Sequence, residues 1–234
     1  MAIILHIETS GLVCSVAISK DKELIFYKES PEKMSHSSSL AVLINEGLNS
    51  CKISSSDLNA VAVSQGPGSY TGLRIGISTA KGLCYGSDIL LLAIPTLSIM
   101  VQTVINKKNG IEKNGNLFLC PMIDARRMEV YNALYDINGQ RQTDIKADII
   151  SEDSYFEILK NNKIYFFGDG ADKCKVLINH LNAHFINNIY PSAKYMLKLA
   201  NKKYEAQQFE DVAYFEPFYL KDFIATIPKK NIYK

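Results

Sequence analysis

The spacing of apolar and polar residues in the first half of the chain predicts three strands, followed by a helix and two strand–helix pairs. Short polar turns join the three strands, so neighbouring strands should pair in the antiparallel sense. The expected elements are, in order, strands 2–7, 12–19 and 23–27, helix 35–50, strand 60–64, a helix from 69 or 70 to about 85, strand 89–93 and helix 96–105. This half therefore has the order βββαβαβα.

The second half repeats that order after a polar, glycine-containing stretch at 106–116. Its expected elements are strands 116–123, 129–135 and 144–150, helix 151–159, strand 163–167, helix 171–181, strand 184–187 and helix 192–207. We take the two halves as 1–108 and 109–234, with the last helix a candidate to pack back on the first half. This duplicated α/β order predicts the actin-like, ribonuclease-H-type architecture of the ASKHA superfamily.

A glycine-rich stretch, 64–76, joins a strand that looks buried to the helix that starts near residue 69. It matches neither the Walker loop nor the dinucleotide-binding spacing, and the chain has no Gly-x-Ser-x-Gly motif. The helix carries an arc of apolar and small residues roughly twice as wide as the ~100° stripe that a surface helix buries. That arc contains Leu73, Ile77, Ala80, Cys84, Gly72, Gly76, Thr79, Leu83, Ile75 and Gly82. We therefore expect something besides the chain's own sheet to pack on this helix.

Composition places the chain among ordinary globular proteins, with 234 residues, 47% of them hydrophobic and 21% charged. The net charge is +2 and no basic run is interleaved with aromatic residues, so strong, direct RNA binding by this chain alone is not indicated. The five cysteines are scattered and odd in number, as is typical of reduced core cysteines. Because the sequence starts in a strand and has no apolar run of about 20 residues, we expect a cytoplasmic protein with no membrane partner.

Two acidic turn residues occupy matching places in the two halves. Glu8 follows the first strand of the first half, and Asp124 follows the first strand of the second half. In actin-like folds such turns face a shared cleft for nucleotide and metal, and the segment 168–170 lies where these folds place adenosine. We therefore consider a remnant nucleotide cleft made of Glu8, Thr9, Ser10, Asp124, Gly168, Asp169 and Gly170.

Short motifs are spread over nearly the whole chain. They are Glu8-Thr9-Ser10, His36-Ser37, the stretch from Gly66 to Gly76, Lys81-Gly82-Leu83, Pro95-Thr96-Leu97, Asp124-Ala125-Arg126-Arg127, Glu129-Val130-Tyr131, Gly168-Asp169-Gly170 and Pro217-Phe218-Tyr219-Leu220. Together they resemble the TsaB (YeaZ) family. The resemblance implies an actin-like fold that has lost catalysis. It also implies a role in making N6-threonylcarbamoyladenosine (t6A) in transfer RNA, as a scaffold that activates a TsaD-like catalytic subunit and works with a TsaE-like ATPase.

The first helix carries a single histidine, His36, with Leu40 four residues after it and Glu32 four before. The related TsaD enzymes bind metal through two histidines four apart, because imidazoles one helical turn apart can chelate one ion. A lone histidine near a helix start is more often a capping or packing residue. The resemblance therefore implies no catalytic residue, no metal and no resident cofactor. Weak ATP or ADP binding stays open, either in the remnant cleft or at a partner interface. The chain departs from the family over 33–38, where an arginine shortly before the histidine and a glutamate two residues after it are frequent, and at Lys221, where arginine is frequent. Lysine cannot reproduce the paired contacts of arginine.

The helices over 35–50 and 70–85 carry few charges, as the core of a protein interface requires. We expect them to dock on a TsaD-like partner or, in the isolated chain, on a second copy, with tRNA bound only through the complex. The residues expected at this interface are His36, Leu40, Leu43, Ile44, Gly47, Gly72, Leu73, Gly76, Ile77, Ala80 and Leu83. Gly76 is taken here as a surface glycine, so the fold should survive a change to Glu.

Three other interpretations stay open. In the first, both helices are simply buried within the monomer. In the second, the chain is an ATP-dependent kinase or ATPase that uses Glu8 and Asp124. The third, a glycoprotease, has no supporting Ser/His/Asp or metalloprotease pattern.

Overall fold

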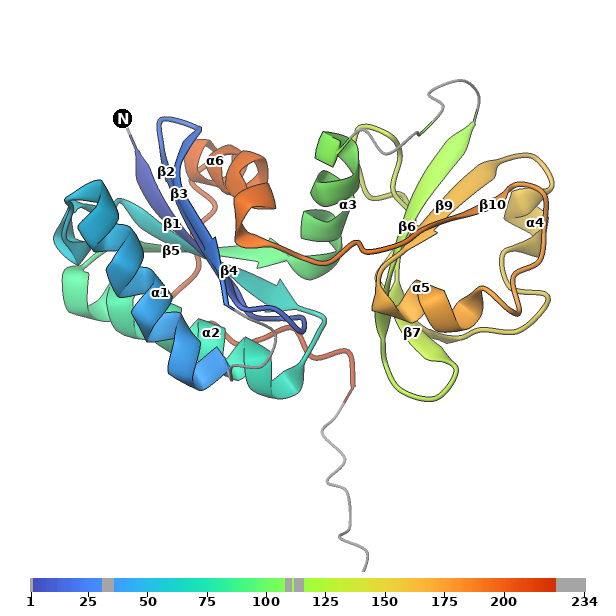
Figure 1. The fold of residues 1–234 in the computed structure, drawn as a ribbon, viewed down its shortest axis with the longest axis horizontal. Helices are drawn as coiled ribbons and strands as arrows, with labels where there is room; N and C mark the ends of the chain where they lie inside the picture. Colours follow the sequence, from blue (N-terminus) through green and yellow to red (C-terminus); the bar gives the residue numbers. More distant parts are fainter. Residues whose placement is uncertain (1, 31–35, 108–110, 112–115, 222–234) are drawn as a thin grey trace, which may run out of the picture.

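The computed structural model describes residues 2–30, 36–107, 111 and 116–221, which form two α/β halves side by side (Figure 1). The first half contains β1 (Ile3–Glu8), β2 (Ser15–Lys20), β3 (Glu23–Glu29), α1 (His36–Cys51), the short 3-10 helix η1 (Ser55–Asp57), β4 (Ala60–Gly66), α2 (Tyr70–Ser87), β5 (Leu90–Pro95) and α3 (Thr96–Lys107). The second contains β6 (Leu117–Asp124), β7 (Glu129–Asn132), β8 (Lys146–Ile149), α4 (Phe156–Leu159), β9 (Lys163–Phe167), α5 (Asp169–Cys174), β10 (Ala183–Ile186), η2 (Ala193–Tyr195) and α6 (Leu197–Glu205).

Each half is built on one five-stranded sheet, and the two sheets have the same strand order. The first sheet reads β3-β2-β1-β4-β5, and the second, taken from its other edge, reads β8-β7-β6-β9-β10. In both, the first three strands pair antiparallel and the next two join in parallel. The predicted duplicated actin-like fold is therefore confirmed.

Helices α1 and α2 cover one face of the first sheet (Figure 1). Their apolar residues join those of the central strands in one buried cluster, which includes Leu40, Leu43, Ile44, Ile77, Ala80, Cys84, Leu5, Ile7, Val16, Ile18, Val61 and Val63. Gly47 lets α1 come close to the sheet, since a Cβ there would lie 2.9 Å from the Phe26 ring. The apolar stripes of both helices are thus used by the chain's own sheet.

The opposite face of the first sheet is covered by the last helix of the chain. Met196 and Ala200 pack against Ile4, Ala62 and other apolar residues of the sheet. The predicted helix 192–207 is divided into η2 and α6, and both lie on the first half. Helix α3 lies between the two halves, and most of its buried apolar residues pack in the core of the second half.

The helices of the second half are shorter than expected. The predicted helix 151–159 is reduced to α4, because the Ser154 hydroxyl accepts a hydrogen bond from the Ser151 amide in a turn and Tyr155 is left-handed, with φ of 64°. The predicted helix 171–181 is reduced to α5.

Some predictions concern positions outside the described residues, namely most of the 106–116 stretch and residues 33–35 of the departure over 33–38. Within the part of the chain that the structure describes, no helix is both long and apolar enough to cross a membrane.

Candidate functional site

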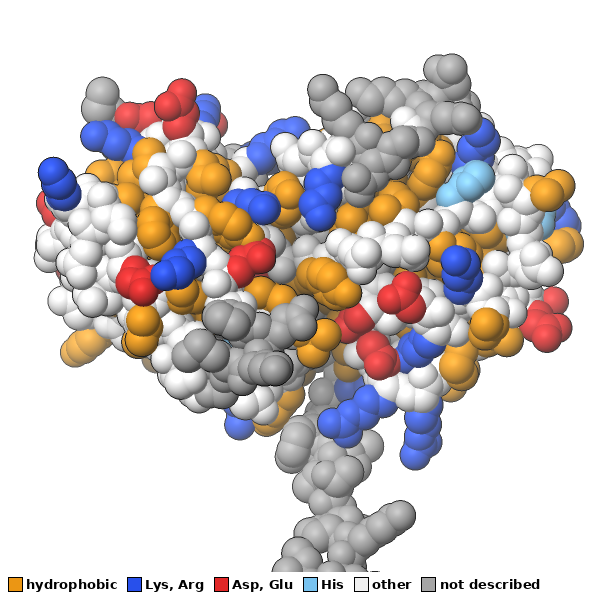
Figure 2. All heavy atoms as spheres, in the orientation of Figure 1, with side chains coloured by type: hydrophobic (Ala, Val, Ile, Leu, Met, Phe, Trp, Pro, Cys, Tyr) orange, Lys and Arg blue, Asp and Glu red, His pale blue; other side chains and the backbone are white. Residues whose placement is uncertain are grey.

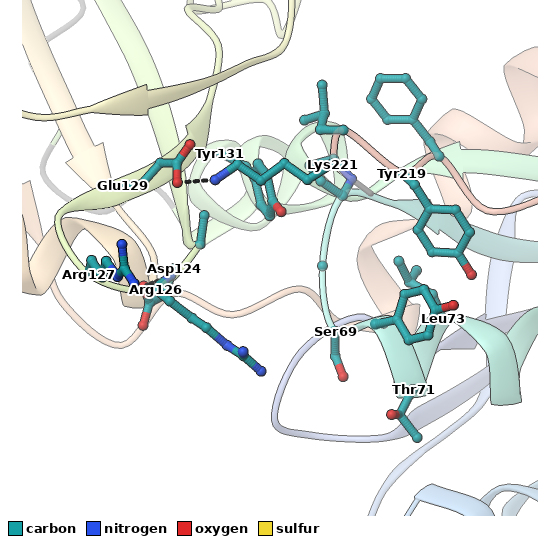
Figure 3. A pocket seen from close by; sticks show the side chains of 16 residues that line it. Ser69, Thr71, Leu73, Asp124, Arg126, Arg127, Glu129, Tyr131, Tyr219 and Lys221 are labelled. Atoms are coloured by element: carbon teal, nitrogen blue, oxygen red, sulfur yellow. Dashed lines mark hydrogen bonds and ion pairs between the residues drawn. The ribbon is translucent and has the colours of Figure 1, made fainter. Parts of the chain in front are cut away.

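A cleft of about 610 Å³ opens between the two halves of the chain (Figure 3). Three segments line it: the β4–α2 loop with the first turn of α2, the β6–β7 turn with the start of β7, and the segment 218–221 near the C-terminus. The first two follow the carboxyl ends of β4 and β6, which are neighbouring rather than equivalent strands of the repeat, since β6 corresponds to β1 and β4 to β9. The third returns from the far end of the sequence.

The β6–β7 turn supplies the strongest charges of the cleft. The Asp124 carboxylate accepts a hydrogen bond from the Arg126 amide at 2.8 Å and forms an ion pair with Lys173. Lys173 also donates to the carbonyl oxygens of Arg127 and Glu129, each at 2.7 Å. Arg126 and Arg127 adopt left-handed backbone angles, with φ of 72° and 51°. The carboxylate is thus neutralised by Lys173 of α5, while Arg126 reaches from the turn toward the loop that carries Ser69 (Figure 3).

The C-terminal segment is fixed to the first half by backbone and side-chain contacts. The Phe218 amide donates to the Gln65 carbonyl at 2.7 Å. Lys81 of α2 donates to the carbonyl oxygens of Ala213 and Phe215, at 3.1 and 3.0 Å. Val212 and Phe215 join Ile75 and Leu83 in the apolar cluster of the first half. The part of the wide apolar arc of α2 that contains Ile75 and Leu83 is therefore covered by the chain's own C-terminal segment.

An aromatic cluster closes one side of the cleft, and an ion pair spans it. The rings of Tyr70 and Tyr219 lie 5.0 Å apart between centroids, and the Arg74 guanidinium lies 4.1 Å above the Tyr70 ring. The Arg74 Nε atom donates to the Tyr219 hydroxyl at 3.1 Å. Lys221 forms an ion pair with Glu129 of the opposite half (Figure 3). The C-terminal segment thus connects α2 to β7.

Glu8 is fully buried and lies outside the lining of this cleft. One carboxylate oxygen accepts hydrogen bonds from the amide and the hydroxyl of Ser10, at 2.6 and 2.5 Å. Burial raises the Glu8 pKa to about 7, against the opposing effect of the hydrogen bonds from Ser10. The expected pair of Glu8 and Asp124 facing one cleft is therefore wrong.

The turn after β1 is buried because α2 packs directly on it. A Cβ at Gly72 would lie 2.1 Å from the Thr9 carbonyl oxygen, and a Cβ at Gly76 would lie 2.2 Å from the Thr9 hydroxyl oxygen. Only glycine fits at these two positions, since real Cβ atoms do not approach other atoms so closely. Gly76 is thus a core residue and not the surface glycine expected from the sequence.

The segment 168–170 holds α5 against β6. Gly168 has φ of 105°, and a Cβ there would lie 2.3 Å from the Met122 carbonyl oxygen. A Cβ at Gly170 would lie 2.8 Å from the Ile123 carbonyl carbon, and the Asp169 carboxylate accepts a hydrogen bond from the Asp124 amide at 3.1 Å. Of the seven residues considered as a remnant nucleotide cleft, Asp124 alone lines this cavity.

The expected interface residues also need correction. Nine of the eleven are buried in the chain's own core: Leu40, Leu43, Ile44, Gly47, Gly72, Leu73, Gly76, Ile77 and Ala80. His36 and Leu83 are half-buried, and His36 Nε2 lies 2.9 Å from the Gly11 carbonyl oxygen. His36 therefore ties α1 to the β1–β2 turn, as a packing residue does. A surface that binds a partner must use other residues of the two helices.

Comparison with known proteins gives the family. The family model described as "TsaD: tRNA N6-adenosine threonylcarbamoyltransferase" matches residues 30–229. The tRNA threonylcarbamoyladenosine biosynthesis protein TsaB of Bacillus subtilis (strain 168) is 30% identical over 178 residues, which are 75% of this chain and 74% of that protein. TsaB of Buchnera aphidicola subsp. Schizaphis graminum is 34% identical over 82% of this chain and 90% of that protein. This chain belongs to the TsaB family.

A solved structure of YeaZ from Pseudomonas aeruginosa has the same fold as this TsaB-family chain. The TM-score is 0.78 at 23% identity, and the likeness covers 94% of this chain and 100% of that one. Within the described residues, no group of three His, Cys, Asp or Glu side chains could hold a metal ion.

Sequence reasoning did not predict Arg126, Tyr131, Tyr219 and Lys221 as neighbours in one cleft. The first three belong to family motifs, so the motifs were the available signal. Their proximity depends on the return of the C-terminal segment to the first half, which hydrophobic periodicity does not reveal.

Proposed function

We propose that this chain acts in t6A biosynthesis as a non-catalytic, cytoplasmic subunit. In this role it docks on a TsaD-type catalytic subunit, works with a TsaE-type ATPase and contacts tRNA only within that complex. When alone, it pairs with a second copy through the same face. The names of its relatives, tRNA threonylcarbamoyladenosine biosynthesis proteins, support the process.

The docking proposal rests on the outer face of α1 and α2. Three charged residues occur in these two helices, which the structure describes in full, and each is engaged within the chain. Glu46 pairs with Lys28 at 2.6 Å, while Arg74 and Lys81 make the contacts with Tyr219 and the C-terminal segment described above. The other exposed residues are uncharged: Ser37, Ser38, Ala41, Val42, Asn45, Asn49, Ser50, Thr71, Ser78, Gly82, Tyr85 and Gly86. We name these twelve the docking face.

Two features of the docking face suit a helical partner. The side chains of Val42 and Tyr85 are 55% and 87% exposed, so large apolar groups project from it. A Cβ at Gly82 or Gly86 would meet no atom within 4 Å, so the α2 backbone is open to close approach there. Depletion of charge together with exposed aromatic and small residues is what an interface core requires.

The alternative of an ATP-dependent enzyme is less well supported. Glu8 is buried and bound to Ser10, and Asp124 is neutralised by Lys173. A metal-assisted phosphoryl transfer needs carboxylates that face the cation, and neither group is available in that way. The exposed guanidinium groups of Arg126 and Arg127, which line the cleft between the halves, are instead suited to the phosphates of a weakly bound ATP or ADP.

The proposed function is tested by reconstitution with the TsaD-type and TsaE-type proteins of the same organism. Measurement of t6A in a tRNA transcript by mass spectrometry should show that the reaction requires this chain, and that Glu8→Gln supports it as well as the wild type. ATP turnover by this chain alone, lost on Glu8→Ala and on Asp124→Ala, would overturn the scaffold proposal in favour of the enzyme.

A further inference from the structure

A second hollow, of about 600 Å³, lies on the first half, away from the cleft described above. It is bounded by α6 and η2, by the β2–β3 turn and by the end of α3, and its lining includes Lys22, Lys194, Lys198, Lys202 and Glu205. In Figure 2, Lys and Arg side chains lie over α6 and toward α3. We name this hollow the lysine groove.

The lysine groove concentrates positive charge. Lys22 pairs with Glu205 at 2.5 Å, whereas Lys194, Lys198 and Lys202 have no carboxylate of the described residues within ion-pair distance. Four lysines and one glutamate give the lining a net charge of 4 − 1 = +3, while the whole chain carries 26 − 24 = +2. The groove therefore carries more net positive charge than the chain as a whole, so it attracts anions.

Lys198 and Lys202 are four residues apart in α6, so they lie on one face of that helix, about 6 Å apart along its axis. Lys194, in η2, lines the same hollow and extends the row. Lys194 is held at one end by the rings of Tyr27 and Tyr195, at 4.4 and 5.2 Å from its Nζ atom. A row of hydrated lysine charges suits an extended polyanion such as a nucleic-acid backbone, and its contacts do not depend on the base sequence.

The position of the groove is compatible with a docked partner. Helix α6 packs on one face of the first sheet, and α1 and α2 pack on the other. The sheet thus separates the lysine groove from the docking face, so a protein bound to α1 and α2 leaves the lysines open.

We propose that the lysine groove binds the phosphate backbone of RNA and is the contribution of this chain to tRNA binding within the complex. The proposal rests on the proposed function, since that function places a tRNA beside this chain. The contacts are made by Lys194, Lys198 and Lys202 with phosphate oxygens and are independent of base sequence. The four-residue spacing of these lysines is visible in the sequence, but the hollow that they share with Lys22 of the β2–β3 turn exists only in the folded chain.

The test compares Lys198→Gln/Lys202→Gln with the control Lys146→Gln/Lys175→Gln, which removes the same charge from exposed positions of the second half. Each full-length chain is combined with the TsaD-type subunit, and its binding to a fluorescent, unmodified tRNA transcript is followed by anisotropy between 50 and 200 mM salt. Loss of two phosphate contacts should lower the slope of log K against log salt by roughly 1.4–1.8 and weaken binding about tenfold. The control pair should match the wild type in both.

Equal slopes and affinities for the two double variants would overturn the assignment of the groove to RNA. Competition by poly-glutamate as strong as that by RNA of equal charge would also overturn it, in favour of an acidic protein. Assembly of each variant with the TsaD-type subunit is measured by sedimentation in the same samples. If the wild-type chain fails to assemble or to support t6A formation, the proposed function fails. If the complex assembles but the groove variant binds RNA as the wild type does, only the assignment of the groove fails.

Discussion

Two glycines of α2 lie in opposite environments, Gly76 in the core of the chain and Gly82 on its docking face. Gly76→Glu places a Cβ 2.2 Å from the Thr9 hydroxyl oxygen and forces a carboxylate into a fully buried turn. Overpacking typically costs about 1–3 kcal/mol, and an unpaired buried charge about 3–5 kcal/mol more. The sum, roughly 4–8 kcal/mol, approaches the ~5–15 kcal/mol by which native domains are stable. We expect Gly76→Glu to unfold the chain or nearly so, in contrast to the expectation drawn from the sequence.

Gly82→Glu should behave in the opposite way. A Cβ at this position meets no atom within 4 Å, and Glu is a better helix former than Gly by about 0.5 kcal/mol, so the fold should be retained and slightly stabilised. The same charge, however, lies in the middle of the docking face and would be desolvated by a partner. We expect at least a tenfold weaker complex with the TsaD-type subunit. Gly82→Ala is the matched control, because it gives a similar gain in helix propensity without a charge.

Urea denaturation followed by circular dichroism gives the free energy of unfolding of the three variants, and sedimentation with the partner gives the affinity. If Gly76→Glu were as stable as the wild type, the packing of α2 on the β1–β2 turn would be refuted. If Gly82→Glu bound the partner and a second copy as tightly as Gly82→Ala, the docking face would have to lie elsewhere on the chain.

Two further predictions concern buried and bridging charges. Glu8 has an unfolded pKa of 4.5 and a folded pKa of about 7, so between these values the folded chain holds the proton more tightly and the free energy of unfolding falls as pH rises. In urea titrations between pH 5 and 8, Glu8→Gln should remove about 3 kcal/mol of that fall. Equal pH dependence in the variant and the wild type would contradict the burial of this carboxyl. Lys81→Met should release the carbonyls of Ala213 and Phe215, at a cost of about 1–3 kcal/mol, and speed hydrogen exchange over 210–221, whereas Lys146→Met should leave that exchange unchanged.

The order of elements could be predicted from the sequence because each strand is a compact apolar run and each turn has its own polar or glycine signal. Strand β9, at Lys163–Phe167, coincides with its predicted range. The errors occur where contacts distant in sequence decide the structure. The apolar arc of α2 was correctly identified as too wide for the sheet, but its cover was expected from a partner, because no local pattern shows that Phe215 returns to this helix.

The candidate site was predicted less well, for a related reason. A carboxylate in a turn looks the same in a sequence whether it faces a cleft or its own chain. Glu8 faces its own chain because Ser10 donates a hydrogen bond to its carboxylate and because the glycines of α2 let the helix pack directly on the turn. Asp124 lines the cleft, yet its partner Lys173 lies 49 residues further along the chain, so the sequence gives no local signal of the pair.

The packing of α2 relates the burial of Glu8 to the proposed docking role. Gly72 and Gly76 let the helix lie directly on the β1–β2 turn, which buries Glu8 and removes one carboxylate from any shared nucleotide site. The same contact fixes α2 on one side, and the C-terminal segment held by Lys81 fixes it on another. A helix held in this way presents its outer face, with Gly82 and Tyr85, as a rigid surface, and a rigid surface loses little conformational entropy when a partner binds. The packing that makes this chain a poor candidate for phosphoryl transfer is therefore the packing that suits it to be a scaffold.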